Sequence, residues 1–201
     1  MASIVFTELL KQAATQNLNT KSNEARSWFR SKAMSISGIS AGIVINQRKE
    51  DQKNSFKPGK MYLFGYDAKN KATLPFWDKY PLIFLLGPAD GGFYGFNLHY
   101  LPYNQRAVVM DALYGIRNNK RMDESTQINM NYTFLKNASK FRYLQPALKH
   151  YLTPHMKTRF VEIPPSEWEI AAFLPLQSFQ NASASTVYSN TQKQNAKRGR
   201  R

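Results

Sequence analysis

Apolar and aromatic residues are concentrated between residues 59 and 103 of the chain. Three runs, Lys60–Tyr66, Pro81–Leu86 and Phe93–Leu101, are each bounded by Gly, Pro or Asp. Runs of this length, rich in aromatic residues, leucine and isoleucine and separated by turn residues, predict β-strands. Residues 90–92 (Asp-Gly-Gly) tolerate positive φ, so the second and third runs are expected to pair as a hairpin. The pattern predicts a three-stranded meander at the centre of a small barrel or a strongly twisted antiparallel sheet.

The three predicted strands carry apolar residues on both faces, which indicates that both faces are covered. We therefore expect five side chains of these runs to form the core: Tyr62, Phe64, Phe84, Phe96 and Leu98.

Helices are predicted before and after the meander. Ser22 or Asn23 is a suitable cap for a helix over residues 24–34. Residues 104–116 have apolar residues at helical spacing, which predicts a helix packed on the sheet.

The pattern changes after residue 126. Residues 127–135 alternate between apolar and polar, which predicts a half-buried strand, and residues 136–152 are predicted to be helical in two pieces, the second beginning near Pro146. A strand is expected over residues 157–163, followed by a short helix whose capping box is Ser166 and Glu169.

These elements together predict an α+β protein with three parts. Residues 1–57 form a basic extension that contains a helix, and its segment 35–57 has the composition of a linker or surface loop. Residues 58–176 form the α+β core. Residues 177–201 are rich in Ser, Asn, Gln and basic residues, which predicts a flexible basic tail.

Charge adds a partner class to this picture. The net charge is +15, and it is uneven: residues 1–60 hold ten basic and four acidic residues, whereas residues 181–201 hold five basic residues and no acidic one. Positive charge concentrated in flanking segments indicates a polyanionic partner such as DNA, although a solubilising surface is the alternative. The candidate phosphate contacts are Arg26, Arg30, Lys32, Lys136, Lys140, Arg142, Lys193, Lys197, Arg198, Arg200 and Arg201.

Trp28 has two interpretations. It lies among Arg26, Arg30 and Lys32 on the predicted N-terminal helix, and an aromatic ring among cations is typical of nucleic-acid binding. We favour the simpler interpretation, in which Trp28 packs on the core and the cations remain on the surface.

Motifs for catalysis are missing from the sequence. It contains no phosphate-binding glycine loop, no serine-hydrolase elbow, no zinc-protease motif and no cysteine, and its three histidines do not have metal-ligand spacing. A metal-dependent nuclease would need clustered carboxylates, for which the candidates are Asp67, Asp78, Asp90, Glu162, Glu167 and Glu169. Turn and capping roles account for several of these, and His99 is expected to be a hydrogen-bonded structural residue. We predict no enzymatic activity, no cofactor, no metal, no small-molecule substrate and no membrane span.

The central segment carries a family resemblance. PGKMYLFGYDAK, TLPFWDKYPLIF and GFYGFNLHYLP, followed by INMNYTFLKNASKFRYLQPALKHYL and PSEWEIAAFLP, resemble the DNA end protector, or head-completion, family of T4-like tailed phages, including those of cyanobacteria, over residues 57 to 175. The resemblance implies a virion protein, assembled in the host cytoplasm, whose partners are double-stranded DNA ends and other phage head or neck proteins. It would shield the DNA end from host exonuclease and make the head competent for tail joining. The alternative is a structural neck or baseplate component that uses its basic tails to bind other virion proteins.

Overall fold

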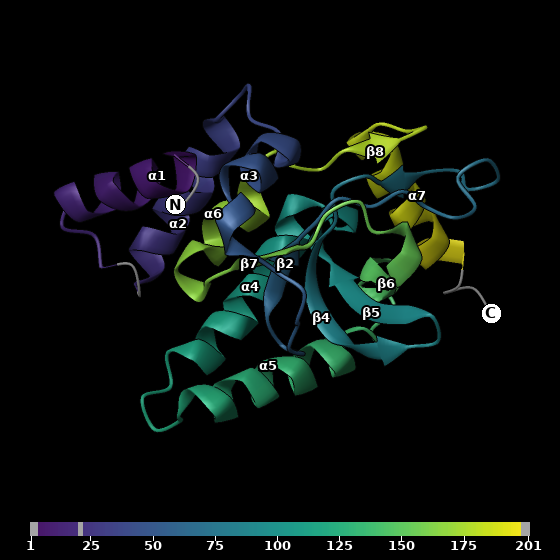
Figure 1. Cartoon of the computed structure of the whole chain (residues 1–201). Helices are drawn as coiled ribbons and strands as arrows, with labels where there is room; N and C mark the ends of the chain where they lie inside the picture. The colour runs from purple at the N-terminus through teal and green to yellow at the C-terminus, as the bar shows by residue number, and fades with distance from the viewer. Residues whose placement is uncertain (1–3, 20–21, 198–201) are drawn as a thin grey trace.

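A computed structural model describes residues 4–19 and 22–197 of the chain. Its elements are a mixture of helices and antiparallel strands, as the sequence predicts (Figure 1). The α-helices in these residues are α1 (Ile4–Thr15), α2 (Asn23–Ser35), α3 (Ala41–Gln47), α4 (Tyr103–Arg117), α5 (Glu124–Ala138), α6 (Trp168–Phe173) and α7 (Ala184–Lys197). The strands are β1 (Gln52–Lys53), β2 (Met61–Leu63), β3 (Trp77–Asp78), β4 (Leu82–Ala89), β5 (Gly92–Asn97), β6 (Leu148–Leu152), β7 (Phe160–Ile163) and β8 (Phe179–Gln180).

The central sheet of the described residues has six antiparallel strands in the order β1-β7-β2-β4-β5-β6. The three predicted strands are its centre, and the predicted hairpin joins β4 to β5 through a turn in which Gly91 has a φ of +66°. The sheet is not closed into a barrel, because its edge strands β1 and β6 do not pair. A second sheet, β3 with β8, ties the loop before β4 to the segment before α7.

Two apolar layers cover the central sheet. One face packs against helices in a cluster that includes Phe84 and Phe96 together with Phe6 of α1, Phe29 of α2 and Phe173 of α6. The other face carries a smaller, aromatic cluster. All five side chains predicted for the core are buried: Tyr62, Phe64, Phe84, Phe96 and Leu98. The predicted extension, residues 1–57, therefore shares the larger cluster with the predicted core.

Two helices confirm their sequence signals. Helix α2 begins after Ser22, whose hydroxyl accepts a hydrogen bond from the backbone N–H of Ala25. Helix α4 covers the predicted segment and buries Val109, Met110 and Leu113.

The predicted strand over residues 127–135 is wrong, because these residues belong to helix α5. Asp123 caps this helix by accepting from the backbone N–H of Thr126, and the buried residues Asn131, Leu135 and Ala138 recur at helical spacing. The apolar residues that alternate along the sequence are only partly buried or exposed, so alternation does not describe the covered face.

Three further predictions after α5 need correction. The second helical piece of residues 136–152 is only a single 3₁₀ turn, Gln145–Ala147, after which β6 pairs with β5. The predicted strand over residues 157–163 is shorter and begins at Phe160. Ser166 does not cap α6, and Glu169 instead forms ion pairs with α2.

The segments predicted to lack regular structure also differ. Residues 35–57 contain α3 and β1, because Ser40 caps α3 and Val44 and Ile45 are buried. Between residues 177 and 197 the chain forms β8 and α7 rather than a flexible tail, because Val187 and Thr191 on α7 are buried against the core. Residues 198–201 of the predicted tail lie outside the described residues.

Candidate nucleic-acid interface

Arg26 and Arg30 on α2 are held by carboxylates of distant helices. Arg26 Nε lies 2.7 Å from Glu169 Oε1, and its Nη2 also pairs with Asp111. Arg30 Nε lies 2.9 Å from Glu169 Oε2, and its Nη2 lies 2.7 Å from Asp111 Oδ1. Although burial raises the pKa of Asp111, hydrogen bonds and charge from Arg30 and Arg26 bring it below its usual value. The two arginines join α2 to α4 and α6, and that use of their charge argues against phosphate contacts.

The two other candidate side chains on α2, Trp28 and Lys32, differ in their exposure to solvent. Trp28 is partly buried and packs against the main core cluster, in agreement with the interpretation that we favoured. Lys32 is exposed, with its Nζ 5.9 Å from the centre of the Trp28 ring. Of the three cations predicted on α2, Lys32 is the one whose charge faces solvent.

Helix α5 and the turn after it bring cations and exposed aromatic rings together. Lys136 and Lys140 are exposed, and the described contacts of their Nζ atoms are the Tyr132 ring and the amide oxygen of Asn137, neither of which is acidic. Phe141 and Tyr143 are 57% and 44% exposed, with ring centres 6.1 Å apart and planes at 28°. Cations beside exposed rings suit a nucleic-acid strand, since the cations bind phosphates and bases stack on rings. We call Tyr132, Lys136, Lys140, Phe141 and Tyr143 the α5 surface.

The exposed rings of the α5 surface were missed by the sequence analysis, which singled out only the cations. The segment Lys140-Phe141-Arg142-Tyr143 alternates basic and aromatic residues, and that alternation could have identified the rings. Arg142 is between Phe141 and Tyr143 in the sequence, and its side chain is half-buried.

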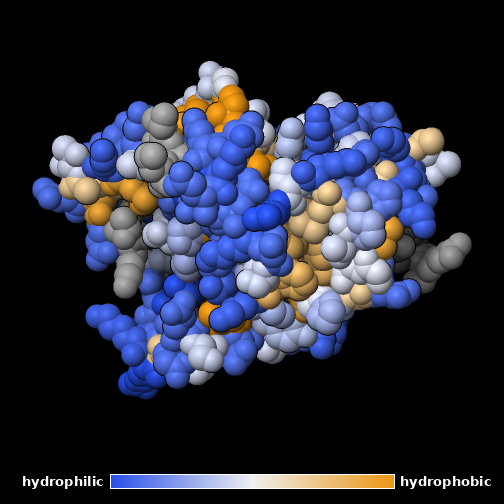
Figure 2. Space-filling view, in the orientation of Figure 1, coloured by the Kyte–Doolittle hydropathy of each residue, from blue (hydrophilic) through white to orange (hydrophobic). Residues whose placement is uncertain are grey.

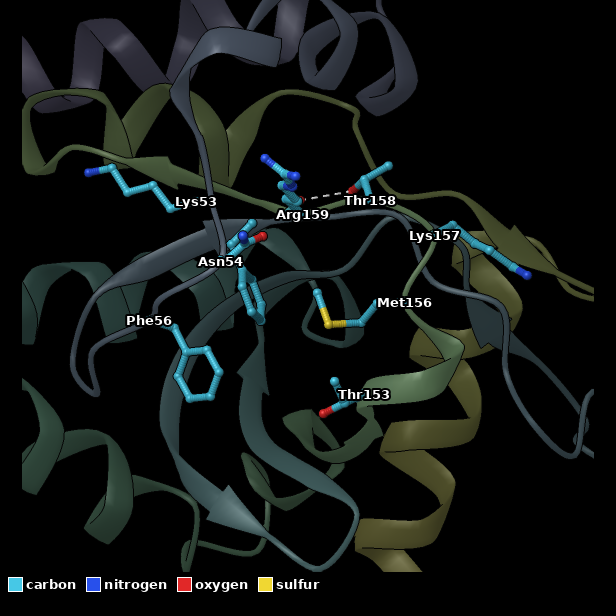
Figure 3. Close-up of a pocket in the computed structure, with 9 residues that line it drawn as sticks. Lys53, Asn54, Phe56, Thr153, Met156, Lys157, Thr158 and Arg159 are labelled. Carbon is cyan, nitrogen blue, oxygen red and sulfur yellow. Dashed lines mark hydrogen bonds between the residues drawn. The ribbon is translucent and has the colours of Figure 1, made fainter.

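A second basic site lies where two distant segments meet beside β1 and β7. The pairing of Lys53 with Phe160 brings residues 53–56 next to residues 153–160. Together they enclose an open pocket of about 370 Å³. Its lining includes Lys53, Lys157 and Arg159 together with Phe56 and Met156, and we call it the basic pocket (Figure 3). Sequence reasoning did not find it, because strand pairing is what joins the two segments.

The acidic groups near the basic pocket are outnumbered. Glu162 pairs with Lys60 at 2.7 Å as well as with Lys53 at 3.3 Å, and Asp67 pairs with Lys71 at 3.1 Å as well as with Lys157 at 3.7 Å. A hydrogen bond from Lys71 lowers the pKa of Asp67. Burial raises the pKa of Glu162, but the hydrogen bonds and charges of Lys60 and Lys53 outweigh burial, so its pKa lies below the usual value. Among the described residues near the pocket there are thus two carboxylates, Glu162 and Asp67, and five cations. The cations are Lys53, Lys60, Lys71, Lys157 and Arg159, so the region has a net positive charge.

The C-terminal cations are only partly described. Lys193 is exposed on α7, and Lys197 is the last residue of that helix. Arg198, Arg200 and Arg201 lie outside the described residues.

Five of the six carboxylates considered for a nuclease, all except Asp90, have structural partners among the described residues. Asp78 Oδ2 is 2.8 Å from His99 Nδ1 in the core, and Glu167 Oε2 is 2.5 Å from Arg48 Nη2. His99 is buried in a 3₁₀ turn rather than in a strand, and its hydrogen bond confirms the predicted structural role. Over residues 4–19 and 22–197, no group of three or more His, Cys, Asp or Glu residues is placed to hold a metal ion.

The face of the protein seen in the orientation of Figure 1 is predominantly hydrophilic. Figure 2 shows polar and charged residues over most of one face, with a paler, more hydrophobic zone near its centre over the sheet. Within the described residues, no helix has the length and apolar character needed to cross a bilayer.

These features define a basic α+β protein in which exposed aromatic rings lie beside exposed lysines, a surface typical of proteins that bind polyanions. A family model described as Phage T4 terminal DNA protecting protein matches residues 4–195, nearly the whole length, so the chain belongs to the phage T4 terminal DNA protecting protein family. No curated protein and no solved structure matches the chain.

Proposed function

We propose that the protein binds the ends of double-stranded phage DNA as a virion component and shields them from exonucleases. The observation that carries this proposal is the family match over residues 4–195, since the family is described by protection of terminal DNA. The net charge of +15 supplies the attraction for phosphates.

The α5 surface is the first candidate for the contact with DNA. Its two lysines are exposed and have no acidic partner among their described contacts, and its two exposed rings have a face for bases. Lys32 and Lys193 are further exposed cations for phosphate contacts. Protection works by occlusion: the bound protein covers the terminus, and no covalent step is needed.

Binding to the DNA terminus would also determine where the protein lies in the phage particle. A protein at the DNA terminus lies where the genome meets the head opening, so we propose that it also contacts head or neck proteins and completes the head for tail joining. A purely structural neck or baseplate component, with basic surfaces bound to other virion proteins, is the competing hypothesis.

Exonuclease protection of end-labelled DNA tests the proposal. Purified protein is incubated with a linear duplex and then with an exonuclease that degrades from the ends, and an endonuclease on a closed circle of the same sequence serves as the control. We expect protection of the linear DNA at protein concentrations that leave cutting of the circle unchanged. Equal affinity for linear and circular DNA, with no protection of the ends, would contradict the proposal and favour the structural component.

A further inference from the structure

The basic pocket has two features that binding through the α5 surface does not use. One is a partly exposed aromatic ring, Phe56, in its wall, and the other is a row of cations along its rim. Figure 3 shows Lys53 and Lys157 on opposite sides of the pocket with their side chains extending away from each other, Arg159 between them, and Phe56 and Met156 below.

Phe56 is fixed in place although 37% of it is exposed. Its ring packs against Phe160 and Phe93, with ring centres 5.3 Å and 5.7 Å away. Both partners are buried members of the aromatic cluster on that face of the sheet. A ring that is held from the protein side and open to solvent is a ready platform for stacking a base, because no side-chain ordering remains to be done.

The backbone segments that carry Lys53, Lys157 and Arg159 are held in place by hydrogen bonds and strand pairing. Thr158 Oγ1 donates to the carbonyl of Arg159 at 2.9 Å and accepts from the backbone N–H of Gly65 at 2.8 Å, which fixes the segment just before β7. Lys53 is on β1, in register with Phe160. The side chains of Lys53 and Lys157 are 55% and 62% exposed, so their ion pairs are the kind that a phosphate displaces easily.

Size limits what the pocket accepts. Its volume of about 370 Å³ lies near the lower end of the range of roughly 300–1,000 Å³ that is usual for ligand pockets. That space suits one nucleotide and is too small for a base pair of an intact duplex. A strand enters such a pocket only where its last nucleotide is free of its partner, and this condition is met at a DNA terminus.

We propose that the basic pocket binds the terminal nucleotide of one DNA strand, with its base stacked on Phe56 and the adjoining phosphates on Lys53, Lys157 and Arg159. This inference rests on the proposed function and gives it a source of preference for ends over internal duplex.

A fluorescent base tests the pocket directly. A linear duplex carries 2-aminopurine at its last position, and a second duplex of the same sequence carries it at an internal position. Stacking on an aromatic ring quenches 2-aminopurine, so we expect the parent protein to quench the terminal base and to leave the internal base unchanged. Phe56→Leu keeps an apolar side chain against Phe93 and Phe160 but removes the stacking face, and it should abolish the quenching and weaken binding to linear DNA by about tenfold.

Arg159→Gln tests the proposed contact between the pocket cations and DNA phosphates. Arg159 is exposed and makes no described ion pair that the substitution would break. We expect weaker binding to the linear duplex and a smaller dependence on salt, by about one phosphate contact. Arg121→Gln is the matched control, since Arg121 is exposed and does not line the pocket, and it should behave like the parent. Thermal melting confirms that each variant is folded.

The outcomes separate this inference from the function on which it rests. If the parent protects linear DNA from exonuclease but does not quench the terminal base, or if both variants match Arg121→Gln, the pocket inference is wrong while end protection stands. If the parent shows neither protection nor preference for linear DNA, the proposed function fails. Competition at the pocket by an acidic peptide, with no quenching by DNA, would assign the pocket to a protein partner and overturn the inference.

Discussion

At the scale of single residues, the buried pair of Asp78 and His99 links stability to pH. Burial lowers the pKa of His99 below its ordinary value, so the folded protein keeps the ring neutral, with Nδ1–H donating to Asp78. Burial raises the pKa of Asp78, but His99 and the amide of Asn97 bring it below its ordinary value, so the carboxylate stays ionised.

We expect acid to destabilise the protein in two steps. The unfolded chain binds a proton on His99 near the ordinary pKa of about 6.5 and the folded chain does not, so stability should fall as pH drops from about 7 to 5. The contribution of Asp78 is present above the ordinary aspartate pKa of about 3.9 and is lost only below it. Melting temperatures of the parent and His99→Gln across this range test the first step. The variant should be less stable by about 1–3 kcal/mol and should lose the dependence between pH 7 and 5; equal slopes would refute the assignment.

Phe84 gives a second residue-scale prediction. Its ring is fully buried in β4 and meets the Trp168 ring edge-on, with centres 4.9 Å apart. Phe84→Ala leaves a cavity between sheet and helices and should lower the free energy of unfolding by about 3–5 kcal/mol. Denaturant titration measures the loss. Val108→Ala on α4, where the side chain is 56% exposed, is the control and should change stability by about 0.5 kcal/mol or less.

At the scale of elements, α7 shows how a polar segment becomes ordered. Among its described side chains, Val187 and Thr191 are buried. Tyr188 is half-buried, and its hydroxyl accepts a hydrogen bond from Arg106 Nη2 at 2.7 Å. Arg106 is fully buried and also donates to the carbonyls of Leu101 and Ala172. Helix α7 therefore supplies a partner that a buried charge requires.

Removing that hydroxyl tests the docking of α7. Tyr188→Phe keeps the ring but takes a partner from the Arg106 guanidinium, so we expect a loss of about 1–3 kcal/mol. Hydrogen exchange of the α7 amides should accelerate in the variant. Tyr143→Phe, which removes an exposed hydroxyl, is the matched control. If the two variants are equally stable, α7 does not depend on Arg106.

The elements that the sequence predicts correctly are those decided by nearby residues. Runs such as Leu82–Ala89 have apolar residues on both faces, and Ser22 is adjacent to the helix that it caps. The alternation of residues 127–135 alone predicts a strand, and Asp123, the residue that caps helix α5, was not part of that prediction. The partners of Arg26 and Arg30 and the lining of the basic pocket could not be predicted, because distant segments supply them.

At the scale of the whole molecule, the net charge of +15 predicts DNA binding that weakens steeply with salt. Each phosphate contact adds about 0.9 to the slope of log affinity against log salt on duplex DNA. Replacing both Lys136 and Lys140 of the α5 surface with Gln should reduce the slope by about 2. Titrations at several salt concentrations measure it.

A double variant of two exposed lysines outside the α5 surface, Lys11→Gln with Lys120→Gln, has the same net charge and is the control. If the two double variants reduce the slope equally, the binding is a property of total charge and not of this surface.

The ion cluster of α2 has a consequence for the timing of synthesis. Arg26 and Arg30 are 143 and 139 residues before Glu169, and Phe29 shares its apolar cluster with Phe173. At the usual rate of about 5–20 residues per second, a ribosome needs on the order of 10 s between making the arginines and making their carboxylate. During that interval α2 lacks Glu169 and the apolar residues of α6, although Asp111 of α4 is made earlier. The nascent N-terminal helices should therefore remain accessible to chaperones and proteases until α6 is synthesised and packs against α2.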